Sequence, residues 1–323
     1  MQCATMEAIL VRKAVAKTKN KMNKVIAIGQ SVIDIIHLNN KPIASFTGGR
    51  IANMAASLGR LGVDVEYVSE CGCDSVGDMV VEFLNENHVG TESIDRFTDG
   101  QSQVSLFFID GDGNERYMEY AKHPSTRFNV LWPKILENDI VVFGSYFALD
   151  EGPRKPLLEL LNYAQERTAI IVYLPGFQPG LCSRITRVMP AVLENLEFAD
   201  VVIARESDMQ EIFGKSDSAA CYKDHISFYC PNFLFTDKAF NIKMHLPGST
   251  IEIKNGGEAP ANKLGWDASL CAGFVYGMLK NDVALEGINA LGEPTWRSIV
   301  ETAKRFADDS AASGKNTISP NLR

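Results

Sequence analysis

The sequence predicts an α/β fold: a doubly wound, mainly parallel sheet flanked by helices, with a small β flap projecting from it. From residue 139 onward, short apolar runs alternate with segments of helical spacing, which is typical of a doubly wound parallel sheet. With 46% hydrophobic and 22% charged residues, the chain can bury a large core. Ligands of such folds bind beyond the carboxyl ends of the strands, so we expect a site there.

The first elements lie around a glycine pair. Residues 25–29 form a continuous apolar run, which indicates a buried strand, and residues 31–36 continue it with one carboxylate, Asp34. Gly48 and Gly49 then open a segment whose apolar residues recur at helical spacing until a further glycine ends it. Glycines let a ligand approach backbone amides, and a lone carboxylate in an apolar run needs a partner. This region is therefore the first candidate site.

The β flap is predicted from turn chemistry. Residues 104–110 and 115–120 flank the sequence Gly111-Asp112-Gly113, which is typical of a hairpin. Because this hairpin lies between α/β units, we expect it to project from the main sheet.

The remaining elements follow in regular order. We expect one domain at 23–312, with flap segments at about 34–47 and 93–121, between an N-terminal tail at 1–22 and a C-terminal tail at 313–323. The pattern predicts strands at 140–143, 169–173, 201–203 and 232–235, helices at 152–166, 184–196, 206–213 and about 267–279, a hairpin at 241–253 and a loop at 255–263.

Charge and composition narrow the classes of partner. The net charge of −8 is spread along the chain, and no basic stripe with interleaved aromatic residues could neutralise nucleic-acid phosphates. The longest apolar run near the N-terminus, residues 8–11, is too short for a signal peptide or a membrane span. Seven cysteines without a C-x-x-C pair, and five histidines without ligand spacing, predict reduced thiols and no metal site. We therefore expect a cytoplasmic protein that binds a small molecule, not nucleic acid or a membrane.

Three features follow one another in the chain: a Gly-Gly-x-x-x-Asn sequence opening a helix, a β flap, and a late glycine turn before a helix containing Ala-Gly-Phe. This order resembles the PfkB, or ribokinase-like, carbohydrate and nucleoside kinases, over about residues 23–312. The resemblance implies that Asp34, Gly48, Gly49 and Asn53 hydrogen-bond hydroxyls of a sugar or nucleoside while the flap closes over it. It also implies ATP and Mg²⁺ as cofactors, and a homodimer that pairs through the flap.

The chemistry of these residues agrees with that role. Asp34 can accept two hydroxyl protons, and Asn53 can donate and accept hydrogen bonds. A simpler interpretation is that Gly48 and Gly49 only form a tight turn, and that Asp34 is a paired structural carboxylate.

The late motif departs from the family pattern, Asp-Thr-x-Gly-Ala-Gly-Asp, in which the glycines form an anion hole and the last Asp is the catalytic base. Aligned without gaps on the following Ala-Gly, Gly265 matches the first glycine, Asp267 the second and Ala268 the base, so the base is missing. A shift of one residue makes Asp267 the base but puts Leu264 and Trp266 in place of both glycines. On the ungapped alignment, Asp267 would repel a bound phosphate by roughly 4 kcal/mol at about 4 Å and an effective dielectric of about 20.

Other sequences on the phosphate side also differ from the family. Its Asp-x-Asn-x-Arg strand end reads Leu-Pro-Gly-Phe-Gln at 174–178, and its Asn-x-x-Glu, which organises Mg²⁺ and phosphate, runs from Arg205 to Asp208. Its nucleotide loop starts at Thr236 but lacks both glycines. Phosphoryl transfer depends on positioned charges and backbone donors, so these are direct losses to the chemistry. The alternative is that the alignments are wrong, or that Arg205, Lys238 and Lys263 supply the positive charge while Asp208 replaces the Glu with a shorter reach.

Two functions therefore stay open. The first is a sugar- or nucleoside-binding protein with weak or no kinase activity, and the alternative is an active sugar kinase with Asp267 as base. Trp266 either plugs the emptied nucleotide site, which we prefer, or stacks on a replacement ligand. No Gly-x-Gly-x-x-Gly follows the first strand and no Gly-x-Ser-x-Gly occurs, which argues against a Rossmann oxidoreductase and an α/β hydrolase.

Overall fold

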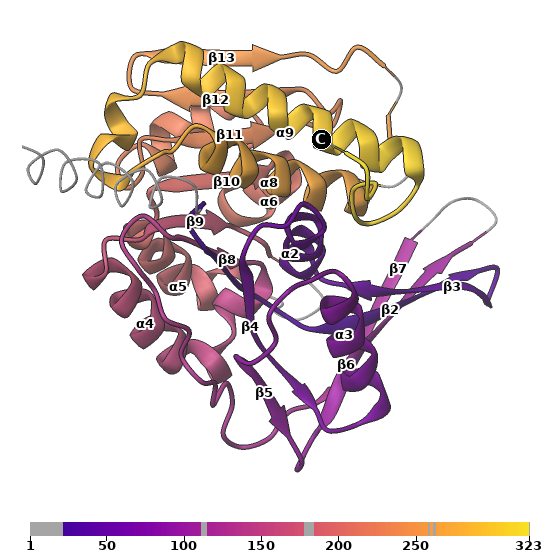
Figure 1. Cartoon of the computed structure of the whole chain (residues 1–323). Helices are drawn as coiled ribbons and strands as arrows, with labels where there is room; N and C mark the ends of the chain where they lie inside the picture. The colour runs from indigo at the N-terminus through magenta and orange to yellow at the C-terminus, as the bar shows by residue number, and fades with distance from the viewer. Residues whose placement is uncertain (1–21, 111–114, 178–183, 258, 261–262, 323) are drawn as a thin grey trace, which may run out of the picture.

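A nine-stranded sheet forms the centre of the protein (Figure 1). The computed structural model describes residues 22–322 except 111–114, 178–183, 258 and 261–262. The strand order is β13-β12-β11-β10-β9-β8-β1-β4-β5; all neighbours from β11 to β5 are parallel, and β12 and β13 add an antiparallel edge. The strands are β1 (Val25–Ile28), β4 (Val65–Gly72), β5 (Ile94–Phe97), β8 (Ile140–Gly144), β9 (Ile170–Leu174), β10 (Val201–Arg205), β11 (Phe233–Thr236), β12 (Ile242–Leu246) and β13 (Ser249–Ile253). The predicted doubly wound, mainly parallel sheet is confirmed.

Helices cover both faces of this sheet because its central strands are apolar on both sides. In β1, Val25 and Ala27 face one hydrophobic core, and Ile26 and Ile28 face the other. The first core packs against α2 (Arg50–Arg60), α3 (Ser75–Glu86), α8 (Lys263–Lys280) and α9 (Glu293–Ser313). The second packs against α4 (Glu151–Glu166), α5 (Ile185–Phe198) and α6 (Glu206–Phe213), with the short helix α7 (Ser218–Cys221) and the helical turns η1 (Tyr146–Leu149) and η2 (Tyr222–Ile226) nearby; η3 (Leu285–Ala290) precedes α9.

A separate four-stranded sheet forms the flap, which projects from the main sheet at the right of Figure 1. Its order is β3 (Lys41–Gly48), β2 (Val32–Leu38), β6 (Gln101–Ile109), β7 (Glu115–Lys122). The expected hairpin turn at 111–113 lies outside the described residues. Residues 31–36 do not continue the first strand, because β1 ends at Ile28 and the chain then crosses into the flap. Residues 94–97, expected in the flap, instead pair with β4 in the main sheet.

The beginning of α8 also differs from the prediction. The helix starts at Lys263 rather than near residue 267, so Gly265 and Trp266 lie in its first turn instead of a loop. After α9, the segment expected as a C-terminal tail packs on α2: Arg60 Nη1 donates to the carbonyl of Ile318 at 2.6 Å, and the Ile318 side chain is buried. Among the helices in the described part of the chain, none is long and apolar enough to cross a membrane.

Candidate functional site

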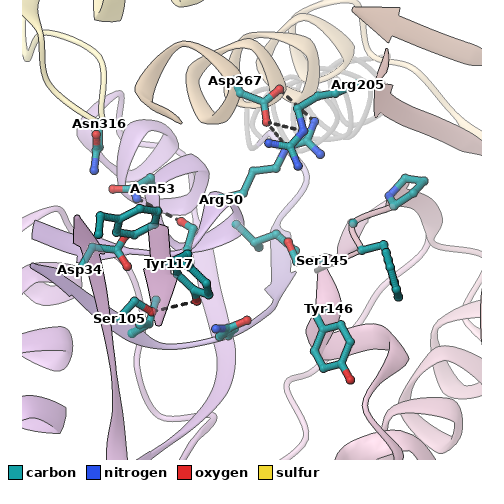
Figure 2. A pocket seen from close by; sticks show the side chains of 18 residues that line it. Asp34, Arg50, Asn53, Ser105, Tyr117, Ser145, Tyr146, Arg205, Asp267 and Asn316 are labelled. Carbon is teal, nitrogen blue, oxygen red and sulfur yellow. Dashed lines mark hydrogen bonds and ion pairs between the residues drawn. The ribbon is translucent and has the colours of Figure 1, made fainter. Parts of the chain in front are cut away.

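A cavity of about 140 Å³ lies where the main sheet meets the flap (Figure 2). Residues within two positions of strand ends line its inner side: Gln30 after β1, Ser145 after β8, and Pro175 with Gly176 after β9. Arg205, the last residue of β10, completes this side. The cavity therefore lies at the carboxyl edge of the parallel strands, where the fold class predicts a ligand. Asp34, Ser105 and Tyr117 face it from the flap, as Figure 2 shows.

The glycine pair makes room for the Asp34 carboxylate. A Cβ at Gly48 would lie 2.2 Å from Asp34 Oδ2, which no side chain tolerates. Gly49 has φ of 92° and is the N-cap residue of α2, and a Cβ there would lie 2.8 Å from the carbonyl oxygen of Gln30. Gly49 lines the cavity, whereas Gly48 acts by leaving space beside the acid. The pair is thus both a tight turn and a part of the site.

Asp34 lies in an environment that disfavours its charge. Burial, and secondly the nearby Glu119 carboxylate, raise the pKa of Asp34 from 3.8 to about 7, against a hydrogen bond from Ser105 that lowers it. Ser105 Oγ lies 3.0 Å from Tyr117 Oη, and Tyr117 Oη donates to Glu119 Oε2 at 2.6 Å. The flap therefore presents a chain of polar groups to the cavity. Asp34 lies at one end of this chain, and the neighbouring groups that shift its pKa include no cation.

Asn53 offers the cavity mainly an acceptor. Its amide nitrogen donates to the carbonyl oxygens of Thr47 at 3.1 Å and Gly49 at 3.0 Å, which uses both amide hydrogens. These bonds hold the glycine turn against the first turn of α2. Asn316, from the segment after α9, lines the same part of the cavity (Figure 2).

At the far end of the cavity, four charged side chains form a network in which Arg50, Asp208 and Asp267 are buried and Arg205 is partly exposed. Arg50 Nη2 donates to Asp267 Oδ1 at 3.2 Å, and Arg50 Nε lies 2.8 Å from Asp267 Oδ2 without the alignment of a hydrogen bond. Arg205 makes two 2.7 Å hydrogen bonds to Asp208 and lies 3.7 Å from Asp267 Oδ2. Burial tends to lower the pKa of Arg50, but the Asp267 carboxylate raises it overall; the Asp208 carboxylate raises the pKa of Arg205 above its ordinary value. The network thus keeps both guanidinium groups charged.

A second cavity, of about 460 Å³, lies on the other side of this network. Asp267 and Arg205 line both cavities, so the network stands between them. Three cationic and three acidic side chains line the second cavity, together with Thr236, Trp266 and two other residues. Trp266 is 2% exposed and packs edge-on against Phe240, with ring centroids 5.0 Å apart. It belongs to the hydrophobic core and forms a wall of the cavity.

The sequence-predicted phosphate-side residues are only partly brought together. Asp267 and Arg205 meet at the junction of the cavities, and Asp208 lies buried behind Arg205. Ala268 is 1% exposed within α8, and Gly265 lies in the first turn of that helix rather than in a glycine loop.

Side chains near the junction do not fit a protein-held Mg²⁺. Within the described ranges, no group of three or more His, Cys, Asp or Glu residues is arranged around a metal position. The nearest carboxylates, Asp208 and Asp267, are both engaged by guanidinium groups, whereas Mg²⁺ needs free oxygen ligands.

Sequence reasoning missed several residues that line the first cavity, among them Arg50, Ser105, Tyr117 and Asn316. Arg50 directly follows the glycine pair, and this position is the signal that could have indicated it. Ser105 and Tyr117 point to the same face of the flap and could have been found from strand alternation once β6 and β7 were paired. Asn316 has no local signal, because only the tertiary fold carries the chain after α9 back to α2.

Known proteins with similar sequences are carbohydrate kinases. The family model described as pfkB family carbohydrate kinase matches residues 22–227. A probable fructokinase-4 of Arabidopsis thaliana is 24% identical over 212 residues, covering 62% of this chain and 64% of that protein. A putative sugar kinase of Pyrococcus horikoshii is 26% identical over 194 residues, covering 57% and 62%. The chain thus spans slightly less than two thirds of the length of these curated relatives.

Solved structures show the same fold. Aminoimidazole riboside kinase from Salmonella enterica, in complex with aminoimidazole riboside and an ATP analogue, has a TM-score of 0.77 at 14% identity, covering 93% of this chain and 97% of that one. Fructokinase from Vibrio cholerae with fructose, ADP and calcium has a TM-score of 0.77 at 17% identity, covering 90% and 94%. These likenesses confirm the ribokinase-like architecture. With a family match over more than half of its length, the chain belongs to the PfkB family of carbohydrate kinases.

Proposed function

We propose that this protein binds a sugar or nucleoside in the cavity between the main sheet and the flap, and that its phosphoryl transfer is weak or absent. The observation that carries this proposal is the position of Asp267 between Arg50 and Arg205, at the junction of the two cavities. On the sugar side, Asp34 and Asn53 offer acceptors to hydroxyl groups, and the family match includes this half of the site.

On the phosphate side, the described cations at the junction of the two cavities are both paired, and Lys263 lines the second cavity farther out. Transfer of a phosphoryl group depends on donors aimed at the charge that develops on its oxygens. Here both arginines at the junction already bind carboxylates, and cations and acids balance along the second cavity. Trp266 forms part of its wall, which favours the interpretation of this residue as a plug. The family match ends at residue 227, before this part of the chain.

An active kinase with ATP and Mg²⁺ is the second candidate. It is favoured by one observation: Asp267 lines both cavities, so its carboxylate lies where an acceptor hydroxyl and a γ-phosphoryl group would meet. In that case Asp267 would accept the hydroxyl proton as general base.

A thermal-shift screen of sugars and nucleosides, each with and without Mg-ATP, separates these candidates. We expect a sugar or nucleoside to raise the unfolding temperature, with no further rise when Mg-ATP is added. A coupled rise together with ADP release would contradict the proposal, and loss of that ADP release in Asp267→Ala would establish Asp267 as base. In an inactive protein, the double change Asp267→Gly with Ala268→Asp tests the ungapped alignment, because it restores the family's glycine and base together.

We also propose that the protein is a homodimer that pairs through the flap. Several large apolar side chains of the flap are exposed: Leu38, Ile43, Phe46, Met118 and Tyr120. Ile43→Asp should shift the mass measured by light scattering from dimer to monomer. Phe228→Asp, at an exposed position outside the flap, is the matched control and should leave the mass unchanged. A monomeric wild-type protein would refute this assembly.

A cytoplasmic location is the third part of the proposal. Five of the cysteines in the described ranges are free, and four of these are buried, as expected where thiols stay reduced. Fractionation of cells that express the protein, with a disulfide-sensitive mobility assay, should find it reduced in the cytosolic fraction.

A further inference from the structure

We propose that Asp267 is a tethered anion: its carboxylate occupies a receptor formed by Arg50 and Arg205, and thereby restricts the cavity to uncharged polyols. The selectivity rests on the proposed binding function, whereas the occupied receptor is a property of the protein alone. The inference assigns a class of ligand, neutral rather than phosphorylated or acidic sugars.

The geometry is that of a bound anion. Two guanidinium groups from different elements converge on one carboxylate: Arg50 from the first turn of α2 at 2.8 and 3.2 Å, and Arg205 from the end of β10 at 3.7 Å. Figure 2 shows both arginines turned toward Asp267 at one end of the cavity. Planar guanidinium groups bind phosphate and carboxylate oxygens in the same way, so the carboxylate stands where an oxyanion of a ligand could bind.

The receptor has no net positive charge with which to bind a further anion. Arg50 and Arg205 carry two positive charges, and Asp208 and Asp267 carry two negative ones, so the network is neutral. Asp34 is the remaining acidic group among the described residues that line the cavity, and it can only add negative charge. A sugar phosphate or sugar acid would lose its hydration and meet no uncompensated cation among the described lining residues. A neutral polyol needs only the hydroxyl partners that Asp34, Asn53 and the flap supply.

Burial makes it unfavourable for a ligand anion to replace Asp267 as the partner of the arginines. The side chains of Arg50, Asp208 and Asp267 are 10%, 2% and 6% exposed, whereas that of Arg205 is 37% exposed, so water can replace little of what the first three would lose. Neither arginine can turn to a ligand without leaving a buried carboxylate unpaired, which is strongly unfavourable. Asp267 itself is fixed by its place in α8 and cannot swing away as a loop residue would.

Two variants of equal net charge distinguish the effect of the position of Asp267 from the effect of losing one negative charge. Asp267→Asn and Asp208→Asn each remove one negative charge from the network. Both carboxylates lie within 4.0 Å of both arginines, but only Asp267 lines the cavity, so only the first change removes the anion from the ligand's side of the network. With inorganic phosphate as the probe, we expect Asp267→Asn to bind at least roughly tenfold more tightly than wild type, and Asp208→Asn to stay near wild type. Adding Arg50→Gln to Asp267→Asn should abolish the gain. Isothermal calorimetry and thermal shift at fixed ionic strength, with chloride as the reference anion, measure these affinities.

Each outcome decides the inference. If folded Asp267→Asn binds phosphate no better than wild type, or if Asp208→Asn gains as much, the tethered anion is refuted. Should Asp267→Asn be unfolded in phosphate-free buffer, folding that depends on added phosphate supports the inference, and failure to fold in excess phosphate overturns it.

The wild-type protein tests the selectivity. Fructose and ribose, each paired with its phosphate ester, are the probes in a thermal-shift titration. We expect shifts with a neutral sugar at least tenfold lower in concentration than with its ester, and the reverse order would overturn the selectivity. If none of the wider set of sugars and nucleosides shifts the midpoint, the proposed binding function is wrong, and the phosphate comparison still decides whether Asp267 occupies the receptor.

Discussion

Replacing Asp34 by Asn should change how the stability of the protein depends on pH. Burial, and then the charge of Glu119, raise the pKa of Asp34 from 3.8 to about 7, so the folded protein keeps this proton at pH values where the unfolded chain has released it. A carboxyl group with a raised folded pKa favours folding at low pH, and this contribution is lost as the pH rises from about 4 to about 7. Asn mimics the protonated acid but does not titrate.

The size of the effect follows from the same pKa. A difference of one pH unit between the folded and unfolded pKa corresponds to about 1.4 kcal/mol, so the whole effect is about 4 kcal/mol at most. Between pH 5 and pH 8, the free energy of unfolding of the wild type should fall by about 2.5 kcal/mol relative to Asp34→Asn. Asp200, whose pKa burial raises to about 6, titrates in both proteins and cancels in the comparison.

Urea unfolding of both proteins at pH 5, 6, 7 and 8 measures this difference. A stability difference that does not change with pH would refute the assigned environment of Asp34. The same residue should reveal itself in binding: hydroxyl donors of a polyol favour the ionised carboxylate, so binding near pH 6.5 should release protons. Calorimetry in two buffers with different ionisation enthalpies detects that release, and Asp34→Asn should abolish it.

Three further changes probe the site. Gly48→Ala would place a methyl group 2.2 Å from the carboxylate on β2 and should abolish the sugar-dependent thermal shift, whereas Gly287→Ala, with no atom within 4 Å of the new Cβ, should preserve it; an equal response of both would contradict the packing argument. Trp266→Ala should lower the free energy of unfolding by about 3–5 kcal/mol, and adenine nucleotides should bind more tightly in calorimetry if the indole is a plug and more weakly if it stacks on a ligand. Arg50→Gln should lower the free energy of unfolding by about 3–5 kcal/mol. In a double-mutant cycle, Arg50→Gln together with Asp267→Asn should destabilise the protein by less than the sum of the two single changes; simple additivity would show that the pair does not interact.

The main sheet could be predicted from sequence because its signals are local. Apolar runs and helical spacing occur within windows of a few residues, and the strands after residue 139 were placed from them within a few residues. The same apolar run could not show that β1 ends at Ile28, because a chain that leaves one buried sheet for another stays apolar. The early start of α8 was missed for a related reason. Gly265 disfavours a helix by about 1 kcal/mol, but burial of Trp266 against Phe240 outweighs that preference.

The candidate site was likewise predictable only where its residues lie close together in the sequence. Asp34 and Asn53 were predicted from a motif whose residues lie close together in the chain, and both line the cavity. Their role in binding stays a prediction. Arg50 and Asp267 were not predicted to meet, because they are 217 residues apart and only the packing of α2 on α8 joins them. Asp267 was expected to repel a bound phosphate. Arg205 was recognised as a possible cation on this side, but its contact with Asp267, and that of Arg50, could not be foreseen.

The neutral network of four charges also limits how the protein can change. Substituting Arg50, Arg205 or Asp267 leaves a buried charge without its main partner, so each of these single steps passes through a less stable molecule. A glycine at position 267 would restore one part of the family's motif but would leave Arg50 without its carboxylate partner. The network can therefore change most readily when a cation and its carboxylate partner are substituted together. Such epistasis preserves the present sequence even without selection for its function.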